Sequence, residues 1–386
     1  MSRTPFSFYE FFAGGGMARA GLGPDWTCRL ANDLDPSKAA AYRANWGGGD
    51  LIAANVWDLT PDDLPGTADL VWASSPCQDL SLAGARAGLS GQRSSAFWGF
   101  WRLIEALDDQ SRAPSVIVIE NVVGLLTSRG GQDFTAICEA LASRHYRFGP
   151  LEINAAQFVP QSRPRLFLIA TRSEGLATED PGPWHGPSAR LAAERLPKAL
   201  KPHWRWWHLP EPDARNTALG DLLEPDDQVI WHSPDQTRRI LALMAPLHRR
   251  RLDQAVVQAR ADGQRQVGAL FRRTRQEQGR SQQRAEVRFD GLAGCLRTAR
   301  GGSSRQTVVV IDPAFEEAAL RTRLMSPREG ARLMGLGDDY ILPKGTAAAL
   351  TLVGDGVAVP VVAFLERHLL RQMVLACQSA RQAAQA

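Results

Sequence analysis

The sequence predicts an α/β fold with a mostly parallel central sheet. Apolar runs at residues 69–73 and 115–119 contain few polar side chains, which is typical of strands buried on both faces of a parallel sheet. Near the N-terminus, an apolar run at residues 6–12 leads through a glycine-rich turn at residues 13–17 into a helix expected at residues 18–22. Strand, glycine turn and helix in this order are the layout of a nucleotide-binding α/β unit.

The bulk composition is that of a globular protein with one large and one smaller domain. The chain has 386 residues, of which 44% are hydrophobic and 22% charged, and its formal net charge is +4. Five cysteines without a C-x-x-C pair give no zinc pattern and fit a reducing cytosol. We find no run of about 18 apolar residues and no signal peptide. We therefore expect no metal site, no membrane span and a cytoplasmic location, and frequent Ala and Arg favour a bacterial or phage source.

The first two predicted strands end in residues suited to a nucleotide. The glycine turn lets the backbone approach a ligand, although a bare link between strand and helix would look the same. Arg19 stands where the third glycine of a dinucleotide fingerprint would be, which argues against NAD. A second strand expected at residues 28–31 leads to Asp33, and an acid at this point can accept from both ribose hydroxyls. Asp35 is expected to cap the helix that follows.

Reactive side chains follow the two central strands. The run at residues 69–73 leads to Cys77, and the run at residues 115–119 leads to Glu120. Chemistry in open α/β sheets gathers at the carboxyl ends of strands. A thiolate can act as a nucleophile, and a half-buried carboxyl can stay protonated and donate. Buried cysteines are usually inert small hydrophobes, and this interpretation is kept for Cys28, Cys138, Cys295 and Cys377.

After the second central strand, we expect a helix at residues 131–143 and two closing strands at residues 146–154 and 165–170. Two arginines lie between or at the start of these closing strands. Arg163 and Arg165 are two residues apart on an extended segment and are therefore expected to point the same way. A guanidinium fork can grip a carbonyl, a carboxylate or a phosphate. A salt bridge on a strand face is the plainer explanation.

The composition changes near Ser173. Prolines and tryptophans crowd residues 181–212, and residues 238–305 are rich in arginine with few acids. Arginine with glutamine suits phosphate contact and base-edge reading, so residues 173–290 are interpreted as a recognition region. An ordinary amphipathic helix at residues 241–260 would explain single arginines, but not the whole cluster.

Three motifs occur in a fixed order: Pro76-Cys77-Gln78, Glu120-Asn121-Val122 and Gln161-Ser162-Arg163-Pro164-Arg165. Together they resemble the cytosine-C5 DNA methyltransferase family, over nearly the whole chain except its middle segment. The resemblance implies a Rossmann-like sheet that binds S-adenosyl-L-methionine (SAM) and a smaller target-recognition domain that binds double-stranded DNA. We expect a catalytic SAM-binding domain at residues 1–172, a target-recognition domain at residues 173–312, and a C-terminal segment at residues 313–386 that returns to the catalytic domain.

The resemblance also implies a cofactor site at the strand ends. In this family Phe12 would lie beside adenine, Asp33 would bind the ribose, and an acid near a third strand expected at residues 55–59 would accept from the adenine amino group. Asp58 is favoured over Asp50 for that acid by its spacing to Cys77. The full set of cofactor residues would be Phe12, Gly14, Gly16, Asp33, Leu34, Asp58, Pro76, Asp355 and Val357. The chain departs from the family at Glu10 (usually Asp), Leu34 (usually larger) and Asp355 (usually Asn).

The reaction implied is methyl transfer to C5 of a flipped-out cytosine. Cys77 would attack C6, Glu120 would share a proton with N3, and Arg165 would hold the carbonyl at C2. Asn121 would position Glu120, and Arg163 would order a loop or the Glu120 carboxylate. The residues expected to contact DNA are Ser81 and Arg93 in a loop at residues 81–93, together with Gln161, Arg297 and Arg305.

Two alternatives stay open at this point. An RNA-modifying branch of the same family would share the motifs, although the large basic segment favours DNA. A DNA-binding relative without catalysis would explain the departures around the cofactor, although Cys77, Glu120 and Arg165 are all present. One recognition region and one site per chain suit a monomer. No nuclease motif occurs in the chain, so any cognate restriction endonuclease would be a separate protein.

Overall fold

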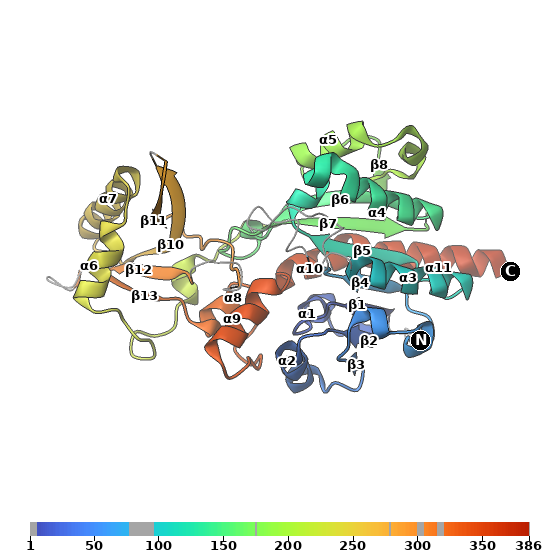
Figure 1. Cartoon of the computed structure of the whole chain (residues 1–386), viewed down its shortest axis with the longest axis horizontal. Helices are drawn as coiled ribbons and strands as arrows, with labels where there is room; N and C mark the ends of the chain where they lie inside the picture. Colours follow the sequence, from blue (N-terminus) through green and yellow to red (C-terminus); the bar gives the residue numbers. More distant parts are fainter. Residues whose placement is uncertain are drawn as a thin grey trace. The chain divides into compact units, whose positions relative to one another are not determined.

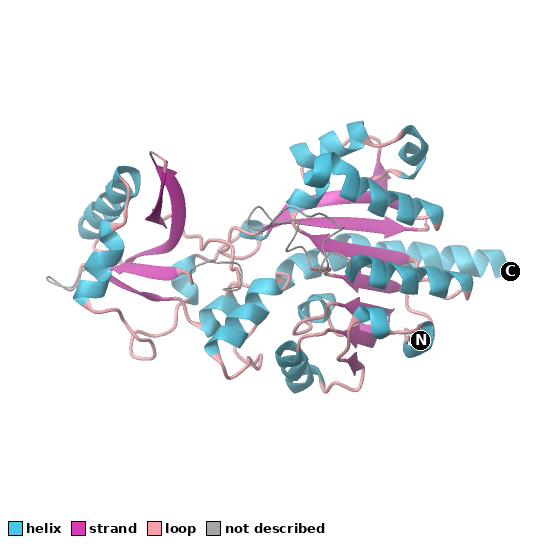
Figure 2. Ribbon diagram, viewed as in Figure 1, coloured by secondary structure: helices cyan, strands magenta, loops and turns pink. Residues whose placement is uncertain are grey.

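The computed structural model describes residues 6–76, 96–173, 176–277, 279–298, 305–314 and 320–385. The chain divides into two compact units, each with its own sheet (Figures 1 and 2). The first unit is assembled from Met1–Asn154, Pro164–Asp213 and Val357–Ala386, and the second from Ala155–Arg163 and Ala214–Gly356. Both predicted domain boundaries therefore differ from the observed division. Residues 173–213 belong to the first unit, and residues 313–356 to the second.

The first unit contains a seven-stranded sheet in the order β3-β2-β1-β4-β5-β7-β6. Strands β1 to β5 pair in parallel, and β7 runs antiparallel to both β5 and β6. The two apolar runs predicted as buried strands are β4 and β5, which pair directly. The mostly parallel α/β sheet is confirmed. The bounds of its strands are β1 (Phe6–Phe11), β2 (Trp26–Asn32), β3 (Leu51–Ile52), β4 (Leu70–Ala73), β5 (Val116–Asn121), β6 (Arg147–Asn154) and β7 (Pro164–Thr171).

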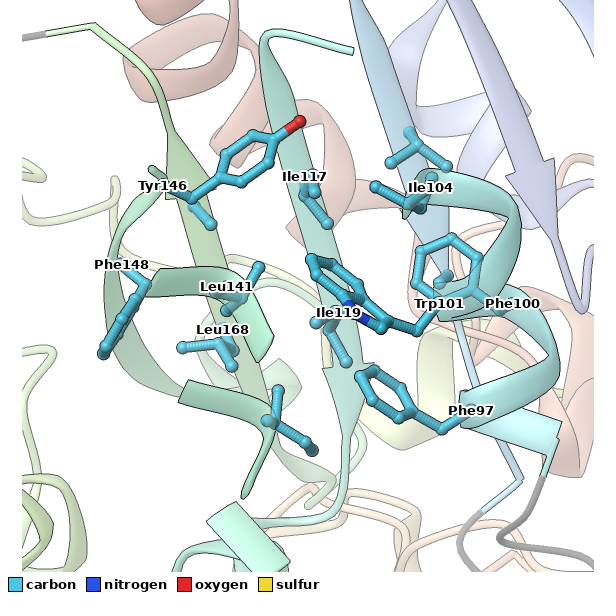
Figure 3. Close-up of a cluster of buried hydrophobic side chains, with 14 of the residues drawn as sticks. Phe97, Phe100, Trp101, Ile104, Ile117, Ile119, Leu141, Tyr146, Phe148 and Leu168 are labelled. Atoms are coloured by element: carbon cyan, nitrogen blue, oxygen red, sulfur yellow. The ribbon is translucent and has the colours of Figure 1, made fainter. Parts of the chain in front are cut away.

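Helices cover both faces of this sheet (Figure 2). They are α1 (Met17–Leu22), α2 (Pro36–Trp46), α3 (Ala96–Asp109), α4 (Gln132–Ser143), α5 (Pro187–Arg195), α10 (Val359–Leu365) and α11 (Arg371–Gln385). On one face, aromatic residues of α3 pack with Ile117 and Ile119 of β5 and with Leu141 of α4, all almost fully buried (Figure 3). On the other face, α1 packs closely on α10, because a Cβ at Gly21 would lie 2.4 Å from the Val362 side chain. Aromatic and branched side chains at these positions bury enough apolar area to fix the sheet.

The predicted third strand is wrong in position. The observed β3 is Leu51–Ile52, whereas Val56–Asp58 forms a single 3₁₀ turn, η1. The Asn55 side chain accepts from the Trp57 amide at 3.1 Å and so caps this turn. Such a local side-chain bond offers the backbone an alternative to sheet pairing.

The Trp- and Pro-rich segment covers the edge of the first sheet. Arg205 donates its amide to the Phe148 carbonyl of β6 at 2.8 Å, beside the short strand pair β8 (Ala177–Thr178) and β9 (Trp206–Trp207). The Trp207 indole donates to the carbonyls of Gly149 and Ile169 at 3.0 and 3.2 Å. The segment therefore provides hydrogen-bond donors to backbone carbonyls of the edge strand β6, which could otherwise pair with a strand of another molecule. Its assignment to the recognition region is corrected.

The second unit is built on an antiparallel sheet in the order β11-β10-β12-β13. Its strands are β10 (Gln266–Glu277), β11 (Arg280–Arg288), β12 (Thr307–Ile311) and β13 (Leu320–Leu324), and its helices are α6 (Pro234–Ala242), α7 (Pro246–Asp262), α8 (Pro327–Arg332) and α9 (Thr346–Asp355). Leu252 and Ala259 of α7 pack on Leu270, Val287 and Val309 of the sheet. The predicted helix at residues 241–260 is thus split into α6 and α7, because Pro246 starts a new helix at its first turn.

One helical stretch of the described chain passes a length and composition test for a membrane span. It runs from Thr346 to Ala383, and its most apolar window has a mean hydropathy of 2.0. Asp355 interrupts its apolar part, so the stretch is not the uninterrupted run of about 18 apolar residues whose absence the sequence indicated. Half of that window is buried inside the protein, including Leu352, Val353 and Val362. Burial against the protein itself accounts for its apolar composition.

Candidate active site

The carboxyl ends of β1, β2, β4 and β5 lie at one edge of the first sheet, because these four strands are parallel. The strand β7 is antiparallel to β5, so its first residues reach the same edge. This topology brings together the glycine turn, Asp33, Ser75 and Glu120 from segments far apart in the sequence. Arg165 joins them from the start of β7. This edge of the sheet is hereafter the active edge.

Glu120 and Arg165 form an ion pair at the active edge. The Arg165 Nε lies 3.2 Å from the Glu120 Oε1, and the side chains are 16% and 8% exposed. Their strands are held in register by the pairing of Glu120 with Phe167. An arginine against a nearly buried carboxylate balances its charge and fixes its direction. The sequence interpretation assigns Arg163, and not Arg165, to the Glu120 carboxylate.

Asn121 ties the end of β5 to the segment that leads to Cys77. Its Nδ2 donates to the Ser75 Oγ at 3.3 Å, and its Oδ1 accepts from the Val122 amide at 2.9 Å. Both Asn121 and Ser75 are buried. The sequence indicated Asn121 but not Ser75, which has no local signal and is recognised only through this contact. Pro76 is exposed at the end of the described segment, and Cys77 lies outside the described residues.

The glycine turn is braced from two sides. Gly14 donates its amide to the Asp33 carboxylate at 2.8 Å, and a Cβ at Gly14 would meet open space. Gly16 has φ +77°, and a Cβ there would lie 2.3 Å from the Trp46 indole nitrogen. That nitrogen donates to the Gly15 carbonyl at 2.9 Å. Sequence reasoning missed Trp46, because it reaches the turn only through the packing of α2.

Asp33 and Leu34 complete the predicted nucleotide-binding edge. Asp33 is 7% exposed, and its two oxygens accept from the amides of Gly14 and Asp35 at 2.8 Å each. Burial raises the pKa of this carboxyl above its ordinary value, although Lys38 and the two amides oppose the shift. Leu34 is 64% exposed, which is unusual for a large apolar side chain beside a buried acid. Phe12 is partly buried and has φ +59°.

The two candidate acids near the third strand differ in availability. Asp50 pairs with Arg19 at 2.6 Å, and Arg19 also donates to the Tyr42 hydroxyl at 2.7 Å. Asp58 is exposed at the end of the 3₁₀ turn η1. Arg19, the residue that departs from the dinucleotide fingerprint, therefore joins α1 to α2 and occupies Asp50, so Asp58 is the accessible acid.

Glu10 is a buried carboxyl beneath the glycine turn. It is 1% exposed, and burial raises its pKa to about 8, although Arg19 and the amides of Ala18 and Arg19 oppose the shift. Its Oε2 has no hydrogen-bond partner among the described residues. A neutral carboxyl is therefore expected here at neutral pH.

This burial predicts a pH dependence of stability. The folded state holds the Glu10 proton up to about pH 8, whereas an unfolded glutamate loses it near pH 4.3. The stabilising contribution is therefore complete below about pH 4.3 and is lost as pH rises toward 8. We expect Glu10→Gln, which cannot ionise, to gain at least about 1 kcal/mol of relative stability between pH 5 and 8. Urea unfolding of both proteins at the two pH values measures this, and a constant difference would contradict the assignment.

Gln161 is not positioned to touch DNA, which corrects its predicted role. Its side chain is fully buried in the second unit, where its Nε2 donates to the Leu333 carbonyl at 2.8 Å. Its Oε1 accepts from the Leu296 amide at 3.1 Å. Both ends of the amide are therefore used inside the protein.

Arg163 also differs from its prediction. It does not lie on the strand with Arg165, because β7 begins at Pro164. Its guanidinium is 1% exposed and donates to the carbonyls of Leu296, Gly354 and Gly356 at 3.0, 2.9 and 2.6 Å. The expectation that both arginines point the same way is wrong, and the described partner of the Glu120 carboxylate is Arg165 rather than Arg163.

The structure also describes four further residues that the sequence predicted for the cofactor and DNA sites. Asp355 is exposed at the end of α9, and Val357 is buried in the first unit. Arg297 is exposed, whereas Arg305 is half-buried and donates to the Met325 carbonyl at 2.9 Å. Burial lowers the pKa of the Arg305 guanidinium. Ser81 and Arg93 lie outside the described residues.

Comparison with known proteins agrees with this geometry. The model of the family described as C-5 cytosine-specific DNA methylase matches residues 6–371. The Type II methyltransferase M.NlaX of Neisseria lactamica is 25% identical over 365 residues, covering 92% of this chain and 94% of the relative. The Type II methyltransferase M.HpaII of Haemophilus parainfluenzae is 24% identical over 388 residues, covering 96% and 91%.

Solved structures show the same fold. The Entamoeba histolytica methyltransferase EhMeth has a TM-score of 0.64 at 14% identity, and covers 96% of this chain and 99% of its own. The Dnmt2 methyltransferase of S. pombe has a TM-score of 0.60 at 16% identity, with the same coverage. The order of the three motifs, the sheet and the family match over residues 6–371 together give the conclusion. The chain is a DNA cytosine-C5 methyltransferase and belongs to the C-5 cytosine-specific DNA methylase family.

Proposed function

We propose that this methyltransferase uses SAM to methylate C5 of a flipped-out cytosine within one short duplex sequence, through a covalent bond between Cys77 and C6. The observation that carries this proposal is the Glu120–Arg165 pair at the active edge. Ser75, two residues before Cys77, is tied to the residue that follows Glu120. The hydrogen bond between Ser75 and Asn121 therefore joins the segment before Cys77, the expected nucleophile, to the strand end that carries Glu120, the expected proton donor.

The active edge fits a nucleoside cofactor. Gly14 has open space where a side chain would stand, Asp33 offers carboxylate oxygens for ribose hydroxyls, and the exposed Leu34 offers an apolar face for adenine. Phe12, Gly16, Asp58, Pro76, Asp355 and Val357 complete the set that would hold SAM. When bound, SAM supplies the methyl group that C5 accepts.

The protein side chains then act on the cytosine ring. The Cys77 thiolate would add to C6, which breaks the aromatic system and makes C5 electron-rich. Glu120 would share its proton with N3, so that negative charge does not build up on the ring, and Arg165 would bind the carbonyl at C2. After methylation, a base removes the proton from C5 and the bond to Cys77 breaks, which restores the thiolate and the aromatic ring.

The substrate geometry requires a second binding surface. C6 is not accessible inside a stacked duplex, so the target base must leave the helix. The second unit, with its arginine-rich hairpin, would hold the duplex during this step. One such unit and one reactive cysteine per chain support a monomer. The Type II relatives support pairing with a separate restriction endonuclease of the same specificity.

Base-resolution bisulfite sequencing tests this function. DNA would come from a methylation-free bacterial host expressing the chain, with an empty-vector culture as control. We expect conversion-resistant cytosines in one short recurring context that is absent from the control.

Two other results would contradict the proposal in different ways. Unmethylated DNA from cells with soluble, SAM-binding protein would indicate RNA as the substrate. Unmethylated DNA from a protein that binds DNA but not SAM would indicate a relative that has lost catalysis.

A further inference from the structure

The hairpin formed by β10 and β11 has a root and a projecting half. Figure 1 shows it as one long, curved ribbon within the second unit. At the root, Leu270, Ala285 and Val287 are buried against α7. Beyond Phe271, residues 272–276 on one strand and 280–283 on the other are all exposed. The projecting half is therefore a two-stranded ribbon with solvent on both faces.

The register gives the ribbon two chemically different faces. Directly paired residues share a face, and the pairs alternate between faces. One face carries mainly uncharged polar side chains, with Arg272 at its root end, and we call it the glutamine face: Arg272, Thr274, Gln276, Ser281 and Gln283. The other carries most of the charge, and we call it the arginine face: Arg273, Arg275, Arg280, Gln282 and Arg284, with Glu277 and Glu286.

Carboxylates order the arginine face. Glu286 accepts from Arg275 Nε at 2.6 Å and lies 3.5 Å from Arg273 Nε. Glu277 accepts from Arg284 Nε at 2.9 Å and from its NH2 group. Four arginines and two glutamates leave this face with a net charge of +2. The glutamates contact three of the four guanidinium groups and cancel half of their charge.

The glutamine face carries groups that suit base edges. An amide side chain has both a donor and an acceptor, and can bind the N6 and N7 atoms of adenine together. Gln276 and Gln283 are exposed on this face, and the Gln276 amide donates to the Ser281 hydroxyl at 2.7 Å. That bond orients one glutamine and leaves its carbonyl oxygen available as an acceptor. Carboxylates are absent from the described residues of this face, so nothing there would repel the duplex.

We propose that the ribbon enters the major groove with its glutamine face toward the base edges, and that Gln276 and Gln283 determine part of the target sequence. The arginine face then supplies phosphate contacts that fix the register. This proposal rests on the proposed function, because it assigns the source of its sequence specificity. The major groove is wide enough for a two-stranded ribbon. Arginine side chains are long enough to extend past the strands toward the phosphates on either wall.

The experiment selects bound sequences from a pool of random DNA duplexes and needs no methylation. The wild type is compared with Gln276→Ala, Gln283→Ala, Arg275→Gln and Arg280→Gln. Gln258→Ala is the matched control, because Gln258 is exposed on α7 and bonded to Asp262 away from the ribbon. The affinity of each protein for the selected duplex is then measured at several salt concentrations.

The two faces are expected to respond differently. Each glutamine variant should lose preference at one position of the selected sequence by about 10- to 100-fold, with the salt dependence unchanged. Each arginine variant should select the wild-type sequence but bind all duplexes more weakly, with the logarithmic salt slope reduced by about 0.9. Gln258→Ala should match the wild type.

The reverse pattern would overturn the proposal: glutamine variants that select the wild-type sequence, or arginine variants that relax one position. A wild type that selects a sequence but leaves DNA unmethylated would count against the proposed reaction alone. The assignment of the ribbon would still be decided by the selected sequences.

Discussion

Cys77→Ser is expected to abolish methylation while leaving DNA binding unchanged. A serine hydroxyl is far less ionised than a thiol at neutral pH and is a poorer nucleophile toward C6. We expect the rate to fall by roughly 10⁴-fold or more, as is typical when a covalent nucleophile is removed. Affinity for duplex DNA should stay within about twofold, because the second unit is untouched.

A covalent trap makes this prediction specific to Cys77. DNA containing 5-fluorocytosine cannot lose its C5 substituent as a proton, so the bond to the nucleophile should persist on a denaturing gel. The wild type should form this adduct when SAM is present, and Cys77→Ser should not. Cys138→Ser is the control, because burial raises the pKa of the Cys138 thiol well above its ordinary value and keeps it un-ionised. An adduct with Cys77→Ser would show that another residue is the nucleophile.

Arg163→Met is expected to destabilise the second unit rather than the chemistry. The substitution would leave the carbonyls of Leu296, Gly354 and Gly356 without their charged donor in a buried site. Hydrogen bonds to charged groups contribute about 1.5–3 kcal/mol each, and the losses are not fully additive. We expect a loss of about 3 kcal/mol, which corresponds to roughly 6–12 °C in melting temperature for a unit of this size.

Hydrogen exchange resolves where the loss occurs. Amides near Leu296 and Gly356 should exchange faster in Arg163→Met, while those of β4 and β5 should keep their protection. Arg297→Met is the matched control, since Arg297 is exposed and should change stability by no more than about 0.5 kcal/mol. If Arg163→Met kept the wild-type melting temperature but lost methylation, the original catalytic role for Arg163 would be favoured instead.

The division between Arg163 and Arg165 shows the limit of motif reasoning. Both belong to one five-residue motif, and period-two alternation placed them on one face. That argument holds only inside a strand, and β7 starts between them at Pro164. Arg165 reaches Glu120 of the first sheet, whereas Arg163 joins the core of the second unit. The residue types were predictable, but the point at which the chain leaves one unit for the other was not.

The domain boundaries failed for a related reason. The tryptophan and proline content of residues 173–213 predicts irregular structure. It does not predict which sheet the segment packs against. Here Trp207 satisfies carbonyls of β6 and β7, which places residues 173–213 on the first sheet. Sequence composition records how polar a segment is, but not which edge strand needs a partner.

The sequence by itself determined the α/β class, the parallel strands β4 and β5, and the family, and it predicted Cys77 and Glu120 as the reactive residues. These can be predicted from apolar runs and from short motifs, because each run or motif lies within a single strand or turn. The tertiary structure decided that Arg165 pairs with Glu120, that Ser75 anchors the segment before Cys77, and that Gln161 is buried. It also gave the ribbon its two faces, because the register of an antiparallel pair is fixed by pairing and not by composition. Contacts between distant segments depend on packing, and packing exists only once the chain has folded.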